Sequence, residues 1–420
     1  MTTTADLESW LQRCDIDKFP YDEIVRQFHL AGKHFVSKEL LDTLDGIRGR
    51  LSELSAPWAD VRTLLAFLDT ALDKPDGRYD YPTYLALDLL DLPGVDDPVE
   101  HAPYVRSRCD RTIVQLVADA LNFELSIAEG YLNILPELRP DASMRTKRYR
   151  HGVRAIRPAL RRLGLADSVI ATEPEQIARQ VCSVVRADMS QHERLVMRLS
   201  NLPVASLHDE YLFLRVLQAF ETSFSFIAVQ LRAAIAALAE HEVDKAERFL
   251  TAAQDALLEV APLFSMLATM QVESFRTFRN FTEGASAIQS RNYKIVEALC
   301  RTPEPDRVDS AAYRSVPEIR ERVLAGGQTL DDGLTAMRES ADFTAADRDR
   351  VQEAMKGFAR ALLRWRTTHY RLAVRMLGDA TGTGYTEGTP YLDAVRDVPV
   401  FEAVDLTKDS EYSAEEDQMA

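Results

Sequence analysis

One apolar stripe near the C-terminus constrains the fold of this chain more than any other feature. Its members are spaced four, three, four, three and four residues apart, and they are Phe358, Leu362, Trp365, His369, Leu372 and Met376. This spacing places all six side chains on one face of an α-helix. Gly378 comes just after the last of them, where a helix commonly ends. The loop that follows contains Gly382, Gly384 and Gly388, so its backbone can approach another group closely.

The same helical periodicity extends over most of the 420 residues. Apolar positions recur at intervals of three and four without the alternation that is typical of strands. A second long stripe consists of Phe213, Leu217, Phe220, Phe224, Ile227, Leu231 and Ile235. We therefore predict an all-α fold in which long helices pack as a bundle. The predicted division is an N-terminal helical region at 1–203, a core at 204–400 and an acidic, disordered tail at 401–420.

The charge balance limits the partners of this chain. Fifty basic and 66 acidic residues give a net charge of -16, which argues against sequence-independent binding of nucleic acid. The basic segment 145–164 could face a nucleic acid, an anionic cofactor or an acidic neighbouring subunit, but a solvated helix face explains it more simply. No window reaches the roughly 20 uninterrupted apolar residues of a membrane span, and residues 1–18 lack the apolar run of a secretory signal. We expect a soluble, cytoplasmic protein that binds neither nucleic acid nor membranes.

Histidine and cysteine are too scattered for a metal site built from several side chains. The four cysteines lie far apart, and the eight histidines form no short ligand motif. Any metal is therefore expected to have one protein ligand, as the iron of a haem does. His369 allows two interpretations: a core histidine with satisfied hydrogen bonds, or a neutral imidazole that faces a haem iron. Helical spacing alone does not decide between them.

The sequence around His369 resembles a known haem-binding segment. WRTTHYRLAVRMLG and the nearby GTGYTEGTPYL resemble the haem-binding helix and the glycine-rich loop of the tryptophan 2,3-dioxygenase family. The resemblance implies that His369 ligates the iron of a b-type haem, and that Trp365, Gly382 and Gly384 lie beside this cofactor. It also implies that Thr383 meets the ammonium group of an amino-acid substrate.

Two further segments extend the resemblance. After the sequence HDE the family has a phenylalanine and then a distal histidine; this chain has Phe213, but Leu217 replaces the histidine. The resemblance places both side chains in the distal pocket, with Phe213 against the substrate. Leu217 cannot exchange protons beside an iron, so no residue is assigned a certain catalytic role. A segment around Phe278 matches the family's substrate-binding region, which implies that Arg279 grips a substrate carboxylate and that Ser286 lies at the haem edge.

The N-terminal region is less informative. Its segment YPTYLALDLL, residues 81–90, weakly resembles the family segment that crosses to a neighbouring subunit's active site, although an ordinary short helix after a proline is the alternative. In the family the segments that flank residues 91–203 lie close together, so the resemblance implies a large insertion here.

The resemblance implies a haem-dependent oxygenase that inserts oxygen into the ring of tryptophan or a related aromatic amino acid, with dioxygen or peroxide as the oxidant. Tryptophan would give N-formylkynurenine. Because Leu217 replaces the distal histidine, the alternative is a monooxygenase that hydroxylates tyrosine or a substituted indole in natural-product biosynthesis. The alternative of another class is a non-catalytic, haem-binding helical protein. Proteins of this family commonly form tetramers, so the resemblance implies a homo-oligomer.

Overall fold

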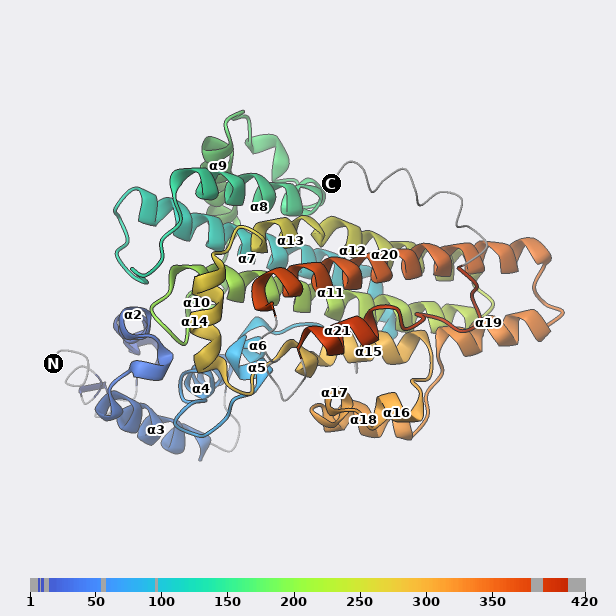
Figure 1. Ribbon diagram of the computed structural model, residues 1–420, viewed down its shortest axis with the longest axis horizontal. Coiled ribbons are helices and arrows are strands. Elements are labelled where there is room, and N and C mark those ends of the chain that lie inside the picture. Colours follow the sequence, from blue (N-terminus) through green and yellow to red (C-terminus); the bar gives the residue numbers. More distant parts are fainter. Residues whose placement is uncertain are drawn as a thin grey trace.

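The chain folds into helices and connecting loops. The computed structural model describes residue 7 and residues 9–10, 15–53, 58–94, 97–378 and 388–406. Within these residues no β-strand forms, and Glu137 and Leu207 share one isolated bridge. The predicted all-α class is therefore confirmed. The longest helices run along the long axis of the molecule (Figure 1).

Helix α11 (His208–Ala239) is the central element of the bundle. It packs against α7 (Ala102–Ala128), α12 (Val243–Val260) and α15 (Arg291–Cys300). Its length and apolar composition would allow it to cross a membrane, but 83% of its most apolar 18-residue window is buried inside the protein. A helix that is apolar on nearly all sides belongs in a core. The predicted stripe is thus only one part of its buried surface.

Helix α20 (Ala345–Leu377) carries the C-terminal stripe and packs along α12. It begins with a capping box: the Thr344 hydroxyl accepts from the Asp347 N–H at 3.2 Å, and the Asp347 carboxylate accepts from the Thr344 N–H at 3.0 Å. It ends at Gly378, whose φ of 60° suits a residue without a side chain. The predicted helix end is confirmed, and the helix starts earlier than the stripe alone indicates.

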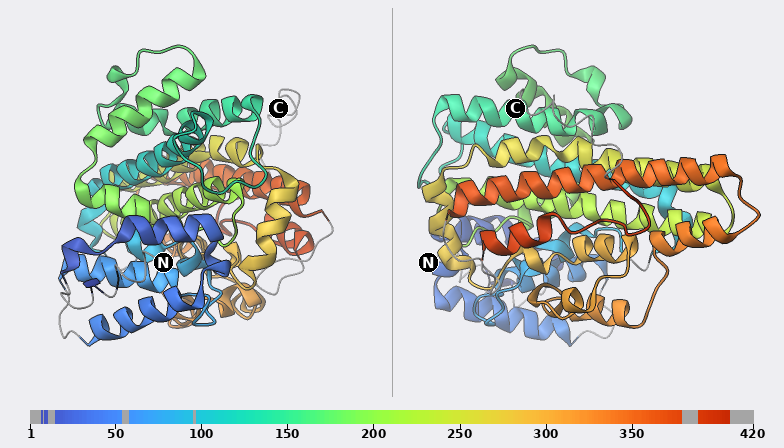
Figure 2. Two further views of the ribbon diagram at one scale, coloured as in Figure 1. Left: turned by 90° about the vertical axis from the view of Figure 1, so that its left-hand side faces the viewer. Right: turned by 45° about the vertical axis from the view of Figure 1, so that its right-hand side comes forward.

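The other described helices surround this bundle. Before α7 they are η1 (Ile16–Lys18), α2 (Tyr21–Ala31), η2 (Lys33–Phe35), α3 (Lys38–Ser52), α4 (Ala59–Ala71), α5 (Tyr81–Tyr84), α6 (Leu87–Leu90) and η3 (Val99–His101). Between α7 and α11 they are α8 (Ala142–Arg162), η4 (Ala166–Ser168), α9 (Pro174–Asp188) and α10 (Gln191–Leu199). After α12 they are α13 (Pro262–Leu267), α14 (Val272–Thr282), η5 (Ala287–Gln289), α16 (Pro305–Val308), α17 (Ala311–Arg314), α18 (Pro317–Leu324), α19 (Leu330–Glu339) and α21 (Thr389–Arg396). Figure 2 shows α8 and α9 on the opposite side of the bundle from the blue N-terminal helices.

A buried charge network crosses the predicted division at residue 203. Arg148 of α8 is fully buried and donates to Glu124 of α7, to the Asp209 carboxylate at 2.6 Å and to the Thr269 hydroxyl at 3.0 Å. Asp209 also accepts from the Gln271 N–H at 2.7 Å, at the start of α14. The network therefore fixes α7, α8, α11 and α14 relative to one another. The division into two regions stays a prediction.

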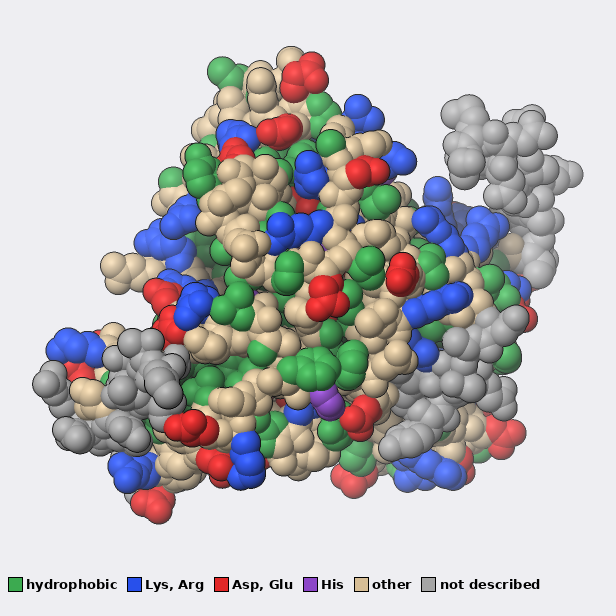
Figure 3. Space-filling view, turned by 60° about the vertical axis from the view of Figure 1, so that its left-hand side comes forward, with side chains coloured by type: hydrophobic (Ala, Val, Ile, Leu, Met, Phe, Trp, Pro, Cys, Tyr) green, Lys and Arg blue, Asp and Glu red, His purple; other side chains and the backbone are tan. Residues whose placement is uncertain are grey.

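The outer surface mixes charges of both signs. On the face shown in Figure 3, basic and acidic side chains are interspersed. The basic segment forms most of α8, and its exposed face carries Lys147, Arg150, Arg154, Arg157 and Arg161. This arrangement agrees with a solvated helix face.

Candidate functional site

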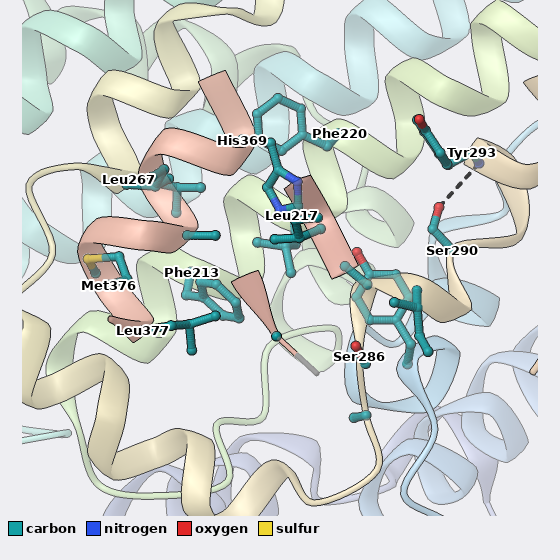
Figure 4. A pocket seen from close by; sticks show the side chains of 18 of the residues that line it. Phe213, Leu217, Phe220, Leu267, Ser286, Ser290, Tyr293, His369, Met376 and Leu377 are labelled. Atoms are coloured by element: carbon teal, nitrogen blue, oxygen red, sulfur yellow. Dashed lines mark hydrogen bonds between the residues drawn. The ribbon is translucent and has the colours of Figure 1, made fainter. Parts of the chain in front are cut away.

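A cavity of about 260 Å³ lies between α5, α11, α13, α14, α15, α20 and α21. Most of its wall is aromatic or aliphatic, as in many ligand sites. Figure 4 shows the labelled apolar side chains around it, Phe213, Leu217, Phe220, Leu267, Met376 and Leu377. The cavity brings together every candidate site residue that the structure describes, namely Phe213, Leu217, Arg279, Ser286, Trp365 and His369.

His369 extends from α20 into this cavity (Figure 4). Its ring lies against Trp365, with 5.3 Å between the centroids and an interplanar angle of 29°, and 6.4 Å from the ring of Phe264. No residue that the structure describes forms a hydrogen bond with its imidazole. Burial lowers the pKa of His369 to about 4. The imidazole is therefore neutral at pH 7, which is the form that ligates a metal.

A metal at this position would have His369 as its protein ligand. The described part of the chain contains no group of three or more His, Cys, Asp or Glu side chains that could hold a metal ion. Cys109 and Cys300 are buried, free thiols, and burial raises the pKa of Cys109 to about 12. The remaining ligands would have to come from a cofactor, as the four ring nitrogens of a haem do.

Two buried donors in the cavity wall lack hydrogen-bond partners among the described residues. One is the Trp365 Nε1 atom. The other is the Lys294 ammonium, whose side chain is almost fully buried and which lies 5.4 and 5.7 Å from the ring centroids of Tyr293 and Tyr313. Burial lowers the pKa of Lys294 to about 8. A buried ammonium without a hydrogen-bond acceptor is costly, so this part of the wall suits an anionic group.

The residues present fit a haem on three counts. The neutral imidazole of His369 suits the iron, and the apolar walls suit the porphyrin ring. The donors of Trp365 and Lys294 suit the propionate carboxylates. The nearby Glu297 attracts the Lys294 ammonium, but both of its carboxylate oxygens already accept hydrogen bonds from Arg307, at 2.9 and 3.1 Å.

Phe213 and Leu217 contribute apolar surface from α11. The Phe213 ring centroid lies 5.8 Å from that of Phe275 and 5.2 Å from that of Phe278. Because Leu217 has no polar atom in its side chain, this part of the wall supplies neither an acid nor a base. It supplies a surface against which an aromatic ring can pack.

Arg279 and Ser286 reach the cavity from α14 and from the loop that follows it. Arg279 is half-buried, and burial lowers the pKa of its guanidinium. The Gln289 N–H donates to the Ser286 carbonyl oxygen at 2.9 Å. The Gln289 side-chain oxygen then accepts from the N–H groups of Ser286, at 3.2 Å, and Tyr81, at 3.0 Å. The loop is thereby joined to α5.

Gly284 brings this loop close to the N-terminal region. A Cβ atom at this position would lie 2.9 Å from the Tyr79 carbonyl oxygen, which is too close for any other residue without movement of the backbone. Gly284 stands where the family that this segment resembles has a proline.

A family model described as tryptophan 2,3-dioxygenase matches residues 189–325. The protein named tryptophan 2,3-dioxygenase from Polaromonas sp. (strain JS666 / ATCC BAA-500) is 27% identical over 273 residues, which cover 56% of this chain and 93% of the relative. Proteins of the same name from Bradyrhizobium sp. (strain BTAi1 / ATCC BAA-1182) and Burkholderia pseudomallei (strain 668) are each 24% identical, over 47% and 46% of this chain and 83% and 74% of their own lengths.

These matches support a divergent member of the tryptophan 2,3-dioxygenase family. They also support the expected enzyme class, a haem-dependent oxidoreductase. The matched range of the tryptophan 2,3-dioxygenase model contains Phe213, Leu217, Arg279 and Ser286, and it ends before α20. The role of His369 therefore depends on the resemblance of its own segment and on the cavity.

Three predicted site residues lie outside the described residues. They are Gly382, Thr383 and Gly384, and their roles stay predictions. On the C-terminal side of that segment, Gly388 and Leu392 line the cavity.

Three residues of this chain match the HDE sequence of the tryptophan 2,3-dioxygenase family, namely His208, Asp209 and Glu210. They anchor α11 and do not line the cavity. His208 pairs with the Glu124 carboxylate at 3.1 Å. Glu210 accepts from the Val204 N–H at 2.7 Å, the Ala205 N–H at 3.1 Å and the Tyr84 hydroxyl at 3.1 Å. These contacts fix the position from which Phe213 and Leu217 extend.

The residues of the cavity wall that the sequence did not assign to the site include Tyr81, Tyr84, Glu221 and Lys294. The two tyrosines belong to the segment that resembles the subunit-crossing one of the tryptophan 2,3-dioxygenase family, but here they come from the same chain as the cavity. Glu221 could have been found because it follows Leu217 by four residues on the same helix face. No local pattern singles out Lys294.

Proposed function

We propose that this protein is a haem-dependent oxygenase that acts on the ring of an aromatic amino acid, with tryptophan as the leading substrate and haem b as the cofactor. The observation that carries the proposal is that a neutral His369 and the guanidinium of Arg279 line one apolar cavity. A haem bound there supplies the oxygen chemistry. The family of the curated relatives supports the same function.

The residues of the chain divide the remaining tasks. His369 would hold the iron of a bound haem through its neutral ring, and Lys294 and Trp365 would donate to the carboxylates of the cofactor. Arg279 binds the substrate carboxylate with two parallel N–H groups. Phe213 and Leu217 pack against the aromatic ring and exclude water from it.

Leu217 supports a second candidate within the same class, a monooxygenase that hydroxylates tyrosine or a substituted indole. A leucine in place of the distal histidine removes one hydrogen-bond acceptor for an indole N–H. The competing class, a non-catalytic haem protein, does not require a guanidinium such as that of Arg279 in the cavity.

The decisive measurement is the absorption spectrum of the protein produced with a haem supply, recorded before and after addition of tryptophan or tyrosine. A Soret band that shifts with one amino acid supports the oxygenase and selects its substrate, whereas a band that responds to neither supports the non-catalytic haem protein. Absence of a Soret band after reconstitution would contradict the proposal. Product analysis then separates ring cleavage from hydroxylation, and light scattering tests for the homo-oligomer that the family resemblance supports.

A further inference from the structure

Helix α21 lies over one side of the cavity without being packed into the core. None of its residues is buried. Four of them nevertheless line the cavity, namely Tyr391, Leu392, Val395 and Arg396, and the helix lies along α20 (Figure 1). The apolar side chains of α21 therefore face the volume of the cavity, where they lack the dispersion contacts of a packed core. A helix with so little buried apolar surface belongs to the least stable parts of a fold.

The chain that follows α21 is firmly attached to the core. The Arg366 guanidinium donates to the Val398 carbonyl oxygen at 2.6 Å. Phe401 is only 3% exposed, and the Glu402 N–H donates to the Asp331 carboxylate at 2.7 Å. These contacts fix the segment directly after α21, so the helix is anchored at its C-terminal end.

Polar contacts join α21 itself to its neighbours. The Nε and Nη2 atoms of Arg307 donate to the two carboxylate oxygens of Glu297, which gives the guanidinium a fixed orientation. Its Nη1 atom donates to the Tyr391 hydroxyl at 2.9 Å, near the start of α21. At the other end of the helix the Arg396 guanidinium carbon lies 4.9 Å from the ring centroid of Tyr370. Such contacts can break and re-form without unfolding the core.

We propose that α21 is a hinged cover of the cavity, which opens at the segment that begins with Val398 and is latched by the bond between Arg307 and Tyr391. The inference goes beyond the proposed function and does not depend on which ligand fills the cavity. A ligand that packs against Leu392 and Val395 gains those contacts only when the cover is closed. Binding therefore shifts the equilibrium toward closure, and opening admits and releases the ligand.

Amide hydrogen exchange, read by mass spectrometry, tests the latch with and without haem. In the haem-free native protein the amides of α21 should exchange faster than those of residues 400–404, which follow the hinge. Tyr391→Phe keeps the ring and removes the latch, so exchange in α21 should become about tenfold faster. Haem should slow exchange in α21 in both proteins, because it stabilises the closed cover.

The rates of haem uptake and release separate a cover from a helix that only contacts the cofactor. When the latch is lost, the open state becomes more populated whether or not haem is bound. Tyr391→Phe should therefore speed both the uptake of haem and its transfer to apomyoglobin about tenfold, with little change in haem affinity. Loss of a contact to the cofactor alone would speed release and leave uptake unchanged.

Tyr313→Phe is the matched control. The Tyr313 ring centroid lies 5.7 Å from the guanidinium carbon of the same Arg307, but the substitution leaves the Tyr391 hydroxyl in place. Exchange in α21 and both haem rates should keep their native values. If Tyr391→Phe does not fold, Arg307→Lys replaces it, because a lysine keeps a cation beside Glu297 but lacks the three nitrogens that bond Glu297 and Tyr391 together.

The outcomes separate the two proposals. A native protein that takes up no haem contradicts the proposed function, and the exchange rates of the haem-free proteins then decide on the cover. The latch is overturned if α21 exchanges equally fast in the native protein and in Tyr391→Phe. It is also overturned if the native amides of α21 exchange as fast as those of an unstructured peptide. A variant that releases haem faster but takes it up at the native rate overturns the cover and leaves the oxygenase intact.

Discussion

Replacing Glu221 with glutamine should make the stability of this protein depend less on pH. Burial raises the pKa of this carboxyl group from its usual 4.5 to about 7, against the opposing effect of its three hydrogen-bond donors and of Lys294. Between these two values the folded protein keeps a proton that the unfolded chain has lost. The free energy of unfolding therefore falls as pH rises through this window, and the glutamine variant does not share that loss.

The magnitude follows from the two pKa values. A tenfold change in an equilibrium constant is worth about 1.4 kcal/mol, so moving the pKa from 4.5 to about 7 corresponds to about 3 kcal/mol. Most of that difference falls between pH 5 and pH 8.5. Relative to the native protein, the variant should gain about 2–3 kcal/mol of unfolding free energy over this range. Burial also raises the pKa of Glu210 to about 7, but this residue is present in both proteins and cancels.

Urea unfolding of the haem-free proteins at pH 5, 7 and 8.5 measures this effect. Glu240→Gln is the matched control, because Glu240 is an exposed carboxylate at the end of the same helix. Its difference from the native protein should stay constant with pH. If the Glu221→Gln difference is equally constant, the carboxylate is ionised throughout in the folded protein, and the reasoning from burial is refuted.

Three other substitutions test the site and its support. His369→Ala should abolish the Soret band, and added imidazole should restore it in part, since the cavity then lacks its one imidazole. Arg279→Ala should weaken binding of the amino acid at least tenfold without changing haem content, and binding of tryptamine, which lacks the carboxylate, should not change. Arg148→Ala leaves Glu124 and Asp209 as buried carboxylates without this partner and should cost about 3–5 kcal/mol of unfolding free energy, measured with urea at pH 7.

Local pattern was sufficient to predict the helices. The spacing of the C-terminal stripe and Gly378 placed the end of α20 correctly, because both signals lie within a few residues of the structure they specify. The start of α11 at His208 has a different physical basis. Leu207 is its N-cap and offers no side-chain cap, while His208 and Asp209 bond α7 and α8.

Long-range contacts explain what the sequence could not reveal. Tyr81 and Gln289 meet across 208 positions, and no periodicity specifies such a contact. The same limit applies to the stripe of α20. Phe358 and Leu362 are fully buried in the core, whereas His369 on the same face opens into a cavity. Spacing gives the face of a helix, and only the packed neighbours determine whether that face meets side chains or an empty volume.

The polar groups of the cavity argue for a site rather than a core. Lys294 and Glu221 are both buried. Burial lowers the pKa of Lys294 to about 8 and raises the pKa of Glu221 to about 7. Apolar side chains of similar volume would make the folded state more stable at these positions. Titratable groups with shifted pKa values that lie around one cavity are typical of functional sites. Leu217 therefore does not mark a decayed site, because the same cavity retains a cation, a carboxyl group and a tyrosine hydroxyl whose presence stability alone does not require.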